Sequence, residues 1–150
     1  MLLEKAERKF KLDTRDYAEL AAFRLALRGF LRFSESVAAA EGLSSQHYQA
    51  MLILRGWPDA GAVSISDLAQ QLLIKHNSAV GLVDRLASEG LVVRETSSVD
   101  RRKVELRLSR RGRDVLARLA ATHRDELQRI GPIMKHFFTA LTPEAEPGSD

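Results

Sequence analysis

The sequence comprises 150 residues, of which 45% are hydrophobic and 29% are charged, the balance of an ordinary soluble globular domain. It holds no run of about 18 apolar residues, which excludes a membrane-spanning helix, and no cysteine, which excludes disulfides, thiol-based redox sensing and Cys-ligated metal sites. The net charge is only +3, but residues 94–113 carry eight Lys and Arg against three acidic residues, a local charge of +5. The first residues, MLLEKAERKFKLD, lack the apolar segment of a secretion signal, so we expect a cytoplasmic protein.

Two helices are predicted in the first third of the chain. Residues 15–41 place apolar side chains at intervals of three and four, as one face of a helix does, and Gly42 suits the position just after its end. At about 1.5 Å per residue this helix is longer than the core of a small domain, so part of its apolar face needs another partner. The second helix, SQHYQAMLILRGW, can be capped by Ser44 or Ser45 and is apolar around nearly its whole circumference, which predicts burial.

Two short helices joined by a tight turn are predicted between residues 63 and 91. Ser66 is a favourable N-cap for the first helix. The sequence IKHN breaks the apolar pattern, Asn77 or Ser78 restarts it, and Gly90 ends the second helix. The predicted inward faces are Leu68, Ala69, Leu72 and Leu73 in the first helix and Ala79, Leu82, Val83 and Leu86 in the second.

A β-hairpin is predicted to follow. The segments LVVRE (91–95) and VELRLS (104–109) have strand composition and flank a polar loop over residues 96–103. Ser109 ends the second strand and can cap the next helix. The alternation in the second strand predicts that it faces the core with Val104, Leu106 and Leu108.

The last part of the chain is predicted to form two helices. The first covers residues 111–128, and Gly131-Pro132 is expected to interrupt the helical pattern because proline lacks the backbone N–H that a helix interior needs. A short, strongly apolar helix follows over residues 133–141. Residues 142–150 have the composition of a disordered tail.

The order of these elements indicates a DNA-binding module. A helix-turn-helix followed directly by a two-stranded hairpin is the pattern of a winged helix. Its second helix can lie in the major groove, where each base pair presents distinct donors and acceptors. The hairpin loop can reach the backbone or the minor groove, where arginine is favoured. A solvated charged surface is the alternative explanation of the basic segment 94–113.

Other classes of site find no support in the sequence. It holds no Gly-rich phosphate loop, nucleophile elbow, HExxH motif or paired carboxylates, so we expect no catalytic residues. His47, His123 and His136 are too far apart in the sequence to give a metal-ligand spacing, so we expect no metal and no cofactor.

The segment GLVDRLASEGLVVRETSSVDRRKVELRLSRRG resembles the core signature of the MarR family of bacterial transcriptional regulators. The matching motifs are the L-V-D-R-L-x-x-x-G-L-V end of the recognition helix, the D-x-R of the wing and the L-x-L-[ST]-x-x-G exit. The upstream ISDLAQQLLI also fits, and the resemblance covers about residues 15–140.

The resemblance implies a fold and a function. The fold class is mainly α with a small β-hairpin wing (α+β), in which terminal helices form a homodimer around two winged helix-turn-helix lobes. Such homodimers bind pseudo-palindromic duplex DNA and usually repress transcription until a small, often aromatic or anionic effector releases them. A winged-helix module for protein–protein contact is the alternative. The implied single domain covers 1–150, with the lobe over 44–110 and the dimerisation helices over 15–41 and 111–141.

The DNA-binding residues that the resemblance implies lie on the recognition helix and the wing. In the family's wing pair, the carboxylate of Asp100 orients Arg102 so that the guanidinium points into the groove. Arg101 and Lys103 are expected to meet phosphates. Many relatives carry Arg or another polar residue where Gly81 stands, so direct base readout by this helix is expected to be thin. The expected helix contacts are Lys75, His76, Asn77, Ser78, Gly81 and Arg85.

Several of these positions have a structural alternative. Arg85 could pair with Glu89, four residues on, rather than with a phosphate. Asp84 is interpreted as structural, and His76 could simply occupy the surface. The implied effector pocket, for which ordinary core or interface packing is the alternative, consists of Phe23, Arg24, Leu27, His47, Tyr48 and Met51.

Overall fold

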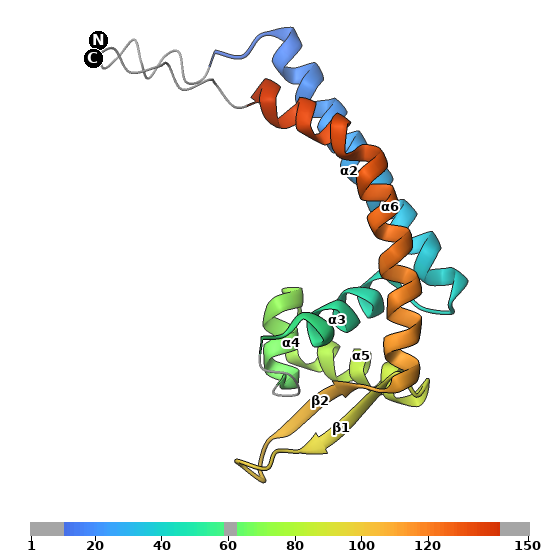
Figure 1. Cartoon of the computed structure of the whole chain (residues 1–150). Helices are drawn as coiled ribbons and strands as arrows, with labels where there is room; N and C mark the ends of the chain where they lie inside the picture. Colours follow the sequence, from blue (N-terminus) through green and yellow to red (C-terminus); the bar gives the residue numbers. More distant parts are fainter. Residues whose placement is uncertain (1–10, 59–62, 142–150) are drawn as a thin grey trace, which may run out of the picture. The chain divides into compact units, whose positions relative to one another are not determined.

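The computed structural model describes residues 11–58 and 63–141 (Figure 1). Over these residues the chain forms five helices and one two-stranded antiparallel sheet, so the predicted fold class is confirmed. None of these helices combines the length and the apolar character needed to cross a membrane. Residues 142–150, expected to be a disordered tail, lie outside the described residues. In chain order the elements are α2 (Thr14–Ala40), α3 (Ser45–Gly56), α4 (Ile65–Leu72), α5 (His76–Ser88), β1 (Val92–Thr96), β2 (Val104–Leu108) and α6 (Arg110–Leu141).

Contacts divide the described residues into two units. The larger unit, Phe33–Arg124, contains α3, α4, α5, the sheet and the adjoining parts of α2 and α6. The smaller unit holds the rest of α2, up to Arg32, and the rest of α6, from Asp125. In the core of the larger unit α3, α4, α5, β2 and α6 each contribute a side chain that is at most 2% exposed: Met51, Leu68, Leu86, Leu106 and Leu119.

The N-cap of α4, the first helix of the helix-turn-helix, lies two residues before the predicted one. Ser64, not Ser66, is the N-cap: its Oγ accepts the backbone N–H of Asp67 at 3.1 Å. The carboxylate of Asp67 in turn accepts the backbone N–H of Ser64 at 2.9 Å. This reciprocal capping box satisfies two backbone N–H donors at once. Because a capping box pairs Asp67 with the serine three residues before it, Ser64 rather than Ser66 becomes the N-cap.

The turn between α4 and α5 corrects two further predictions. Leu73, predicted to face the core, ends α4 in the left-handed conformation with φ 55° and is 92% exposed. The backbone N–H of Ile74 then reaches the carbonyl of Ala69 at 3.0 Å, which turns the chain sharply. As a result α5 starts at His76, ahead of the predicted Asn77 or Ser78.

The second helix of the pair has the predicted inward face and the predicted end. Its buried residues are those of the predicted set, Ala79, Leu82, Val83 and Leu86. Gly90 follows with φ 69°, a conformation that favours glycine, and donates its N–H to the carbonyl of Ala87 at 3.0 Å.

The predicted hairpin is present, with strands that pair from Val92↔Leu108 to Thr96↔Val104. Leu106 and Leu108 are buried as predicted, but Val104 is 42% exposed. It lies at the outer end of the ladder, where no core element covers it, so the alternation of the strand continues beyond the core. An unpredicted bridge joins the sheet to the segment before α4, since the N–H of Leu106 donates to the carbonyl of Val63 at 2.8 Å.

The predicted break at Gly131-Pro132 is absent, because α6 continues through both residues as one helix of 32 residues. Proline removes one backbone hydrogen bond and typically costs about 3 kcal/mol in a helix interior. Packing beyond it offsets this cost: Phe137 is 6% exposed and meets Phe23 of α2 edge-on, with 5.9 Å between ring centroids.

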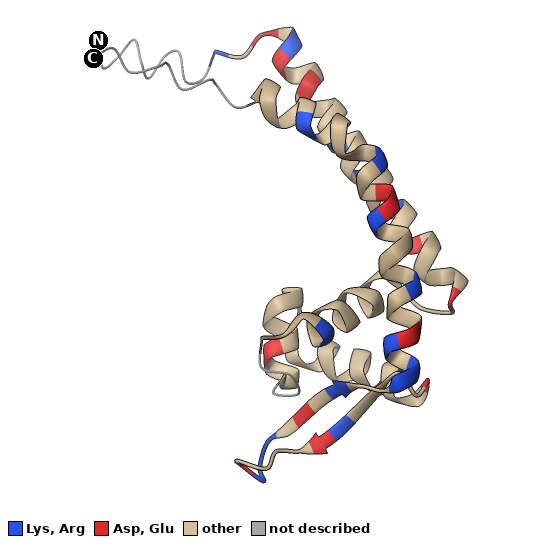
Figure 2. Cartoon of the chain, viewed as in Figure 1, with Lys and Arg blue, Asp and Glu red and all other residues tan. Residues whose placement is uncertain are grey.

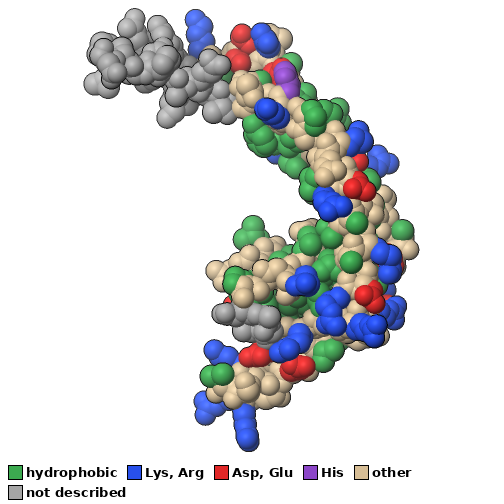
Figure 3. All heavy atoms as spheres, viewed as in Figure 1, with side chains coloured by type: hydrophobic (Ala, Val, Ile, Leu, Met, Phe, Trp, Pro, Cys, Tyr) green, Lys and Arg blue, Asp and Glu red, His purple; other side chains and the backbone are tan. Residues whose placement is uncertain are grey.

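The smaller unit presents many apolar side chains to its surface. His136 Nε2 lies 3.5 Å from Glu19 Oε1, which adds a polar contact between its two helices. Figure 3 shows hydrophobic side chains gathered along these helices. The large exposed apolar residues of this unit are Leu12, Tyr17, Leu20, Leu25, Leu31, Leu127, Ile133, Phe138 and Leu141.

Candidate nucleic-acid interface

The exposed face of α5 holds most of the predicted groove contacts. His76, Asn77, Ser78 and Gly81 are all exposed, on the side opposite the buried residues of α5, and Lys75 precedes them at the N-cap. A methyl group added at Gly81 would meet no atom within 4 Å. The structure therefore brings these positions together on one accessible surface, and Gly81 is not imposed by packing.

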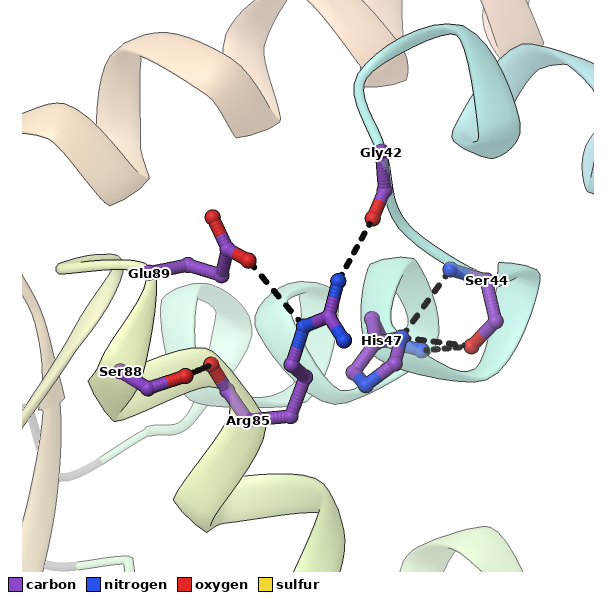
Figure 4. A network of polar contacts seen from close by, with 6 residues as sticks. All are labelled: Gly42, Ser44, His47, Arg85, Ser88 and Glu89. Carbon is purple, nitrogen blue, oxygen red and sulfur yellow. Dashed lines mark hydrogen bonds and ion pairs between the residues drawn. The ribbon is translucent and has the colours of Figure 1, made fainter.

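Arg85, one turn beyond Gly81 on α5, makes the structural contact that was its alternative. Its Nε lies 3.1 Å from Glu89 Oε1, and its Nη2 donates to the carbonyl of Gly42 at 3.5 Å (Figure 4). Arg85 thus joins the end of α5 to the corner between α2 and α3. Its role in DNA contact stays a prediction, and a phosphate would compete with both partners.

His47, predicted to line an effector pocket, completes the N-terminal cap of α3 in this structure (Figure 4). Ser44 Oγ accepts the His47 N–H at 3.2 Å, and the ring Nδ1 accepts the Ser44 N–H at 3.0 Å. Ser44 Oγ also lies 2.7 Å from Nδ1. Only an unprotonated Nδ1 can accept these bonds. Burial, and next the positive charge of Arg85, lower the pKa of His47, while Glu35 and Glu89 oppose the shift.

We expect this cap to make stability depend on pH. Because folding lowers the pKa of His47, its contribution is complete above the ordinary value near 6.5 and is lost as the pH falls through the lowered value. Urea unfolding at pH 7.5 and 5.5 should show a loss of about 1 kcal/mol at the lower pH, the typical value of an N-cap. His47→Gln keeps an acceptor at this capping-box position and should remove that part of the pH dependence. An equal loss in the variant would contradict the assignment.

Ion pairs neutralise the cations on the hairpin strands but not those at its tip. Arg94 pairs with Asp84 of α5, which confirms the structural interpretation of Asp84, and Arg107 pairs with Glu95 across the strands at 3.2 Å. Figure 2 shows this mixture of charges along the hairpin and basic residues at its tip. Within the described part of the chain no ion pair involves the exposed cations of the tip, which are Arg101, Arg102 and Lys103.

Asp100 acts on Arg102 through the backbone rather than through the guanidinium. Its Oδ1 accepts the backbone N–H of Arg102 at 3.0 Å, an Asx turn, and no ion pair forms between the two side chains. The orientation of the Arg102 guanidinium in a DNA groove stays a prediction. The carboxylate fixes the chain direction at the tip and leaves the Arg102 side chain exposed.

A hollow of about 650 Å³ separates the N-terminus of α4 from the wing. His76, Arg102 and Lys103 line one part of it, which places the start of α5 and the wing tip around the same space. The sequence does not predict that α4 takes part in this surface. The signal that could have located the N-terminus of α4 is its capping box, formed by Ser64 and Asp67. The other lining residues are Ser64, Ile65, Ser66, Asp67, Val104 and Glu105.

Comparison with known proteins identifies a family that part of the chain matches. Residues 41–103 match the MarR family. A Thauera aromatica protein described as a transcriptional regulatory protein for the hcr operon is 31% identical over 101 residues, which are 67% of this chain and 55% of that protein. The match thus spans about half the length of this relative. The solved structure of the multiple antibiotic-resistance repressor (MarR) from Listeria monocytogenes is 26% identical with a TM-score of 0.63, over 88% of this chain and 98% of that one.

Residues 41–103 of this chain are therefore a MarR-family segment.

Two further MarR-like structures share the fold. AbsC, a MarR family transcriptional regulator from Streptomyces coelicolor, is 22% identical with a TM-score of 0.68, over 89% of this chain and 86% of that one. The F27L mutant of MepR from Staphylococcus aureus, solved bound to an oligodeoxyribonucleotide, is 15% identical with a TM-score of 0.60, over 89% and 87% of the two chains.

The effector residues expected of a MarR-family protein fall into both units. Phe23, Arg24 and Leu27 lie in the smaller unit, and His47, Tyr48 and Met51 in the larger. Met51 is fully buried in the core. Tyr48 is 6% exposed and stacks on His123, with 4.0 Å between ring centroids. Both therefore pack as core residues here, and the effector pocket stays a prediction.

His123 is a buried residue for which the sequence pattern predicts no role. Its Nδ1 lies 2.7 Å from the carbonyl of Leu119, and its Nε2 lies 2.8 Å from Ser34 Oγ. A carbonyl can only accept, so Nδ1 carries a proton. Within residues 11–58 and 63–141 no group of three His, Asp or Glu side chains could hold a metal ion. We interpret His123 as a polar tie between α2, α3 and α6.

Proposed function

We propose that this chain is a MarR-family, homodimeric, sequence-specific DNA-binding regulator of transcription, most simply a cytoplasmic repressor. The observation that carries the proposal is the group of exposed cations at the wing tip, Arg101, Arg102 and Lys103, beside the exposed start of α5. In this proposal α5 lies in the major groove with Asn77 and Ser78 toward the bases, and the wing follows the backbone into the adjacent minor groove. The proposal assigns no catalytic role to the chain.

The relatives support the DNA partner. MepR was solved with an oligodeoxyribonucleotide, and the Thauera aromatica relative is described as a transcriptional regulatory protein. Release by a small aromatic or anionic effector is part of the proposal and rests on the family alone. A winged-helix module that binds only proteins is the alternative, and salt dependence separates the two.

DNA binding is tested by selecting duplexes from a random pool and then measuring affinity for the selected duplex at rising salt. If about six phosphates are neutralised, affinity should fall roughly 10³-fold between 50 and 200 mM salt, because each phosphate contact releases a counterion. Protected half-sites should lie about 34 Å apart, one turn of the double helix. Failure to enrich any duplex, or a flat salt dependence, would favour the protein-binding alternative.

The homodimer is proposed because the apolar surface of the smaller unit needs a cover, and a second copy presents the same surface. Leu25 and Leu31 are 66% and 53% exposed on α2. We expect the wild type to sediment as a dimer and the double variant Leu25→Glu/Leu31→Glu as a monomer. Leu73→Glu, on a leucine that is 92% exposed in the larger unit, is the matched control and should remain dimeric. A dimer unaffected by the double variant would place the interface elsewhere.

A further inference from the structure

We propose that Ser97 is a positioning residue of the wing: its hydroxyl holds the loop in its DNA-binding shape before DNA arrives. The inference rests on the proposed function and names a residue that the family motif leaves out. Ser97 itself is 5% exposed, so it acts on DNA only through the loop that it orders.

The contacts of Ser97 close the base of the loop. Its Oγ accepts the backbone N–H groups of Val99 and Asp100, both at 3.2 Å. Its own N–H donates to the carbonyl of Lys103 at 2.9 Å. The buried side chain of Ser97 therefore holds the first half of the loop, at Val99 and Asp100. Its backbone N–H holds the end of the loop, at Lys103.

A second turn is built on the first. The N–H of Lys103 donates to the carbonyl of Asp100 at 3.0 Å, and Asp100 Oδ1 accepts the N–H of Arg102 at 3.0 Å. Arg101 and Arg102 occupy the two corner positions of this turn. Because Ser97 holds the N–H of Asp100, it sets the position from which both arginines project.

Apolar packing does not offer the loop another anchor. Val99 in the loop is 94% exposed, and Val104, the first residue of β2, is 42% exposed, so neither valine is buried. The hydrogen bonds of Ser97 and Asp100 are therefore what holds the tip in one conformation. Ordering a loop costs conformational entropy, and a loop that is already ordered does not incur this cost on binding.

The test compares Ser97→Ala with Ser97→Thr, which keeps the hydroxyl, and with Ser98→Ala, the same deletion at the exposed neighbouring serine. On a duplex selected from a random pool, Ser97→Ala should bind about tenfold more weakly, while the other two variants bind as the wild type does. The salt slope of Ser97→Ala should equal that of the wild type because every cation is kept. Arg102→Ala, by contrast, should lower the slope by about 1.

Hydrogen exchange in the free protein gives a readout that needs no DNA. The amides of Val99 and Asp100 should exchange at least about fivefold faster in Ser97→Ala than in wild type and Ser98→Ala, with the thermal midpoint unchanged. Wild-type affinity in Ser97→Ala would overturn the proposal. So would a lowered midpoint, which would make Ser97 a residue of general stability. If wild type binds no duplex at all, the proposed function fails, and the exchange rates alone still decide whether Ser97 orders the loop.

Discussion

Gly112→Ala should destabilise the protein by about 3 kcal/mol, at the upper end of what overpacking costs. A Cβ atom at this position would lie 2.1 Å from the backbone carbonyl oxygen of Leu91 and 3.0 Å from its carbon. Backbone atoms in a well-connected turn yield less readily than the end of a flexible side chain, so the start of α6 would have to move.

That movement would break a compact set of bonds where the wing meets α6. Ser109 Oγ accepts the N–H of Gly112 at 2.9 Å and donates to the carbonyl of Gly90 at 2.6 Å. The N–H of Ser109 donates to the carbonyl of Leu91 at 3.0 Å. The final glycine of the L-x-L-[ST]-x-x-G motif thus permits the N-terminus of α6 to pack against the turn between α5 and β1.

Urea unfolding followed by circular dichroism measures the effect, with Gly81→Ala as the matched control. The control makes the same change in a helix interior with open space around it, so it should be neutral or stabilise by up to about 1 kcal/mol. Equal midpoints for Gly112→Ala and wild type would show that α6 can shift without cost.

The second large effect concerns the wing tip. Asp100→Ala should weaken DNA binding about fivefold, the equivalent of one hydrogen bond of about 1 kcal/mol, although it removes a negative charge from the loop that we propose to face DNA. Arg102→Ala should weaken it by about tenfold or more, since it removes a cation outright.

Asp100→Asn separates the two ways in which Asp100 could orient Arg102. Asparagine keeps an oxygen that can accept the Arg102 N–H, so the backbone contact seen at 3.0 Å predicts affinity equal to or above that of the wild type. Orientation of the guanidinium by charge predicts a loss as large as that of alanine. Titration of the three variants on one selected duplex decides between these outcomes.

Much of the larger unit could be predicted because its periodic patterns are strong and local. The inward face of α5 follows from the three- and four-residue spacing of its apolar residues. The end of the helix follows from Gly90, because glycine readily adopts the left-handed conformation found there. The errors have physical causes of two kinds. The pattern favours Ser66 over Ser64 as the cap because helical spacing does not reveal the reciprocal bond from Asp67. The same spacing predicts a buried Leu73, whereas the left-handed turn at this residue ends α4 and exposes the side chain.

Other features depend on contacts that no local pattern encodes. The continuity of α6 past Pro132 requires the packing of Phe137 against Phe23, more than a hundred residues earlier in the chain. The structural contact of Arg85 involves the carbonyl of Gly42, which a helical repeat does not reveal. The bond from the backbone N–H of Arg102 to Asp100 depends on the turn of the loop, which the D-x-R motif does not specify.

The division of α2 and α6 between two units has a consequence for how the chain folds during synthesis. Residues 33–124 form a contiguous stretch and can collapse around their own core as soon as they leave the ribosome. The smaller unit has no such independence, because the early half of α2 must wait for the late half of α6. Until Phe137 is made, Phe23 has no ring to pack against. The apolar stripe of α2 is therefore the segment of the nascent chain that most needs protection from aggregation.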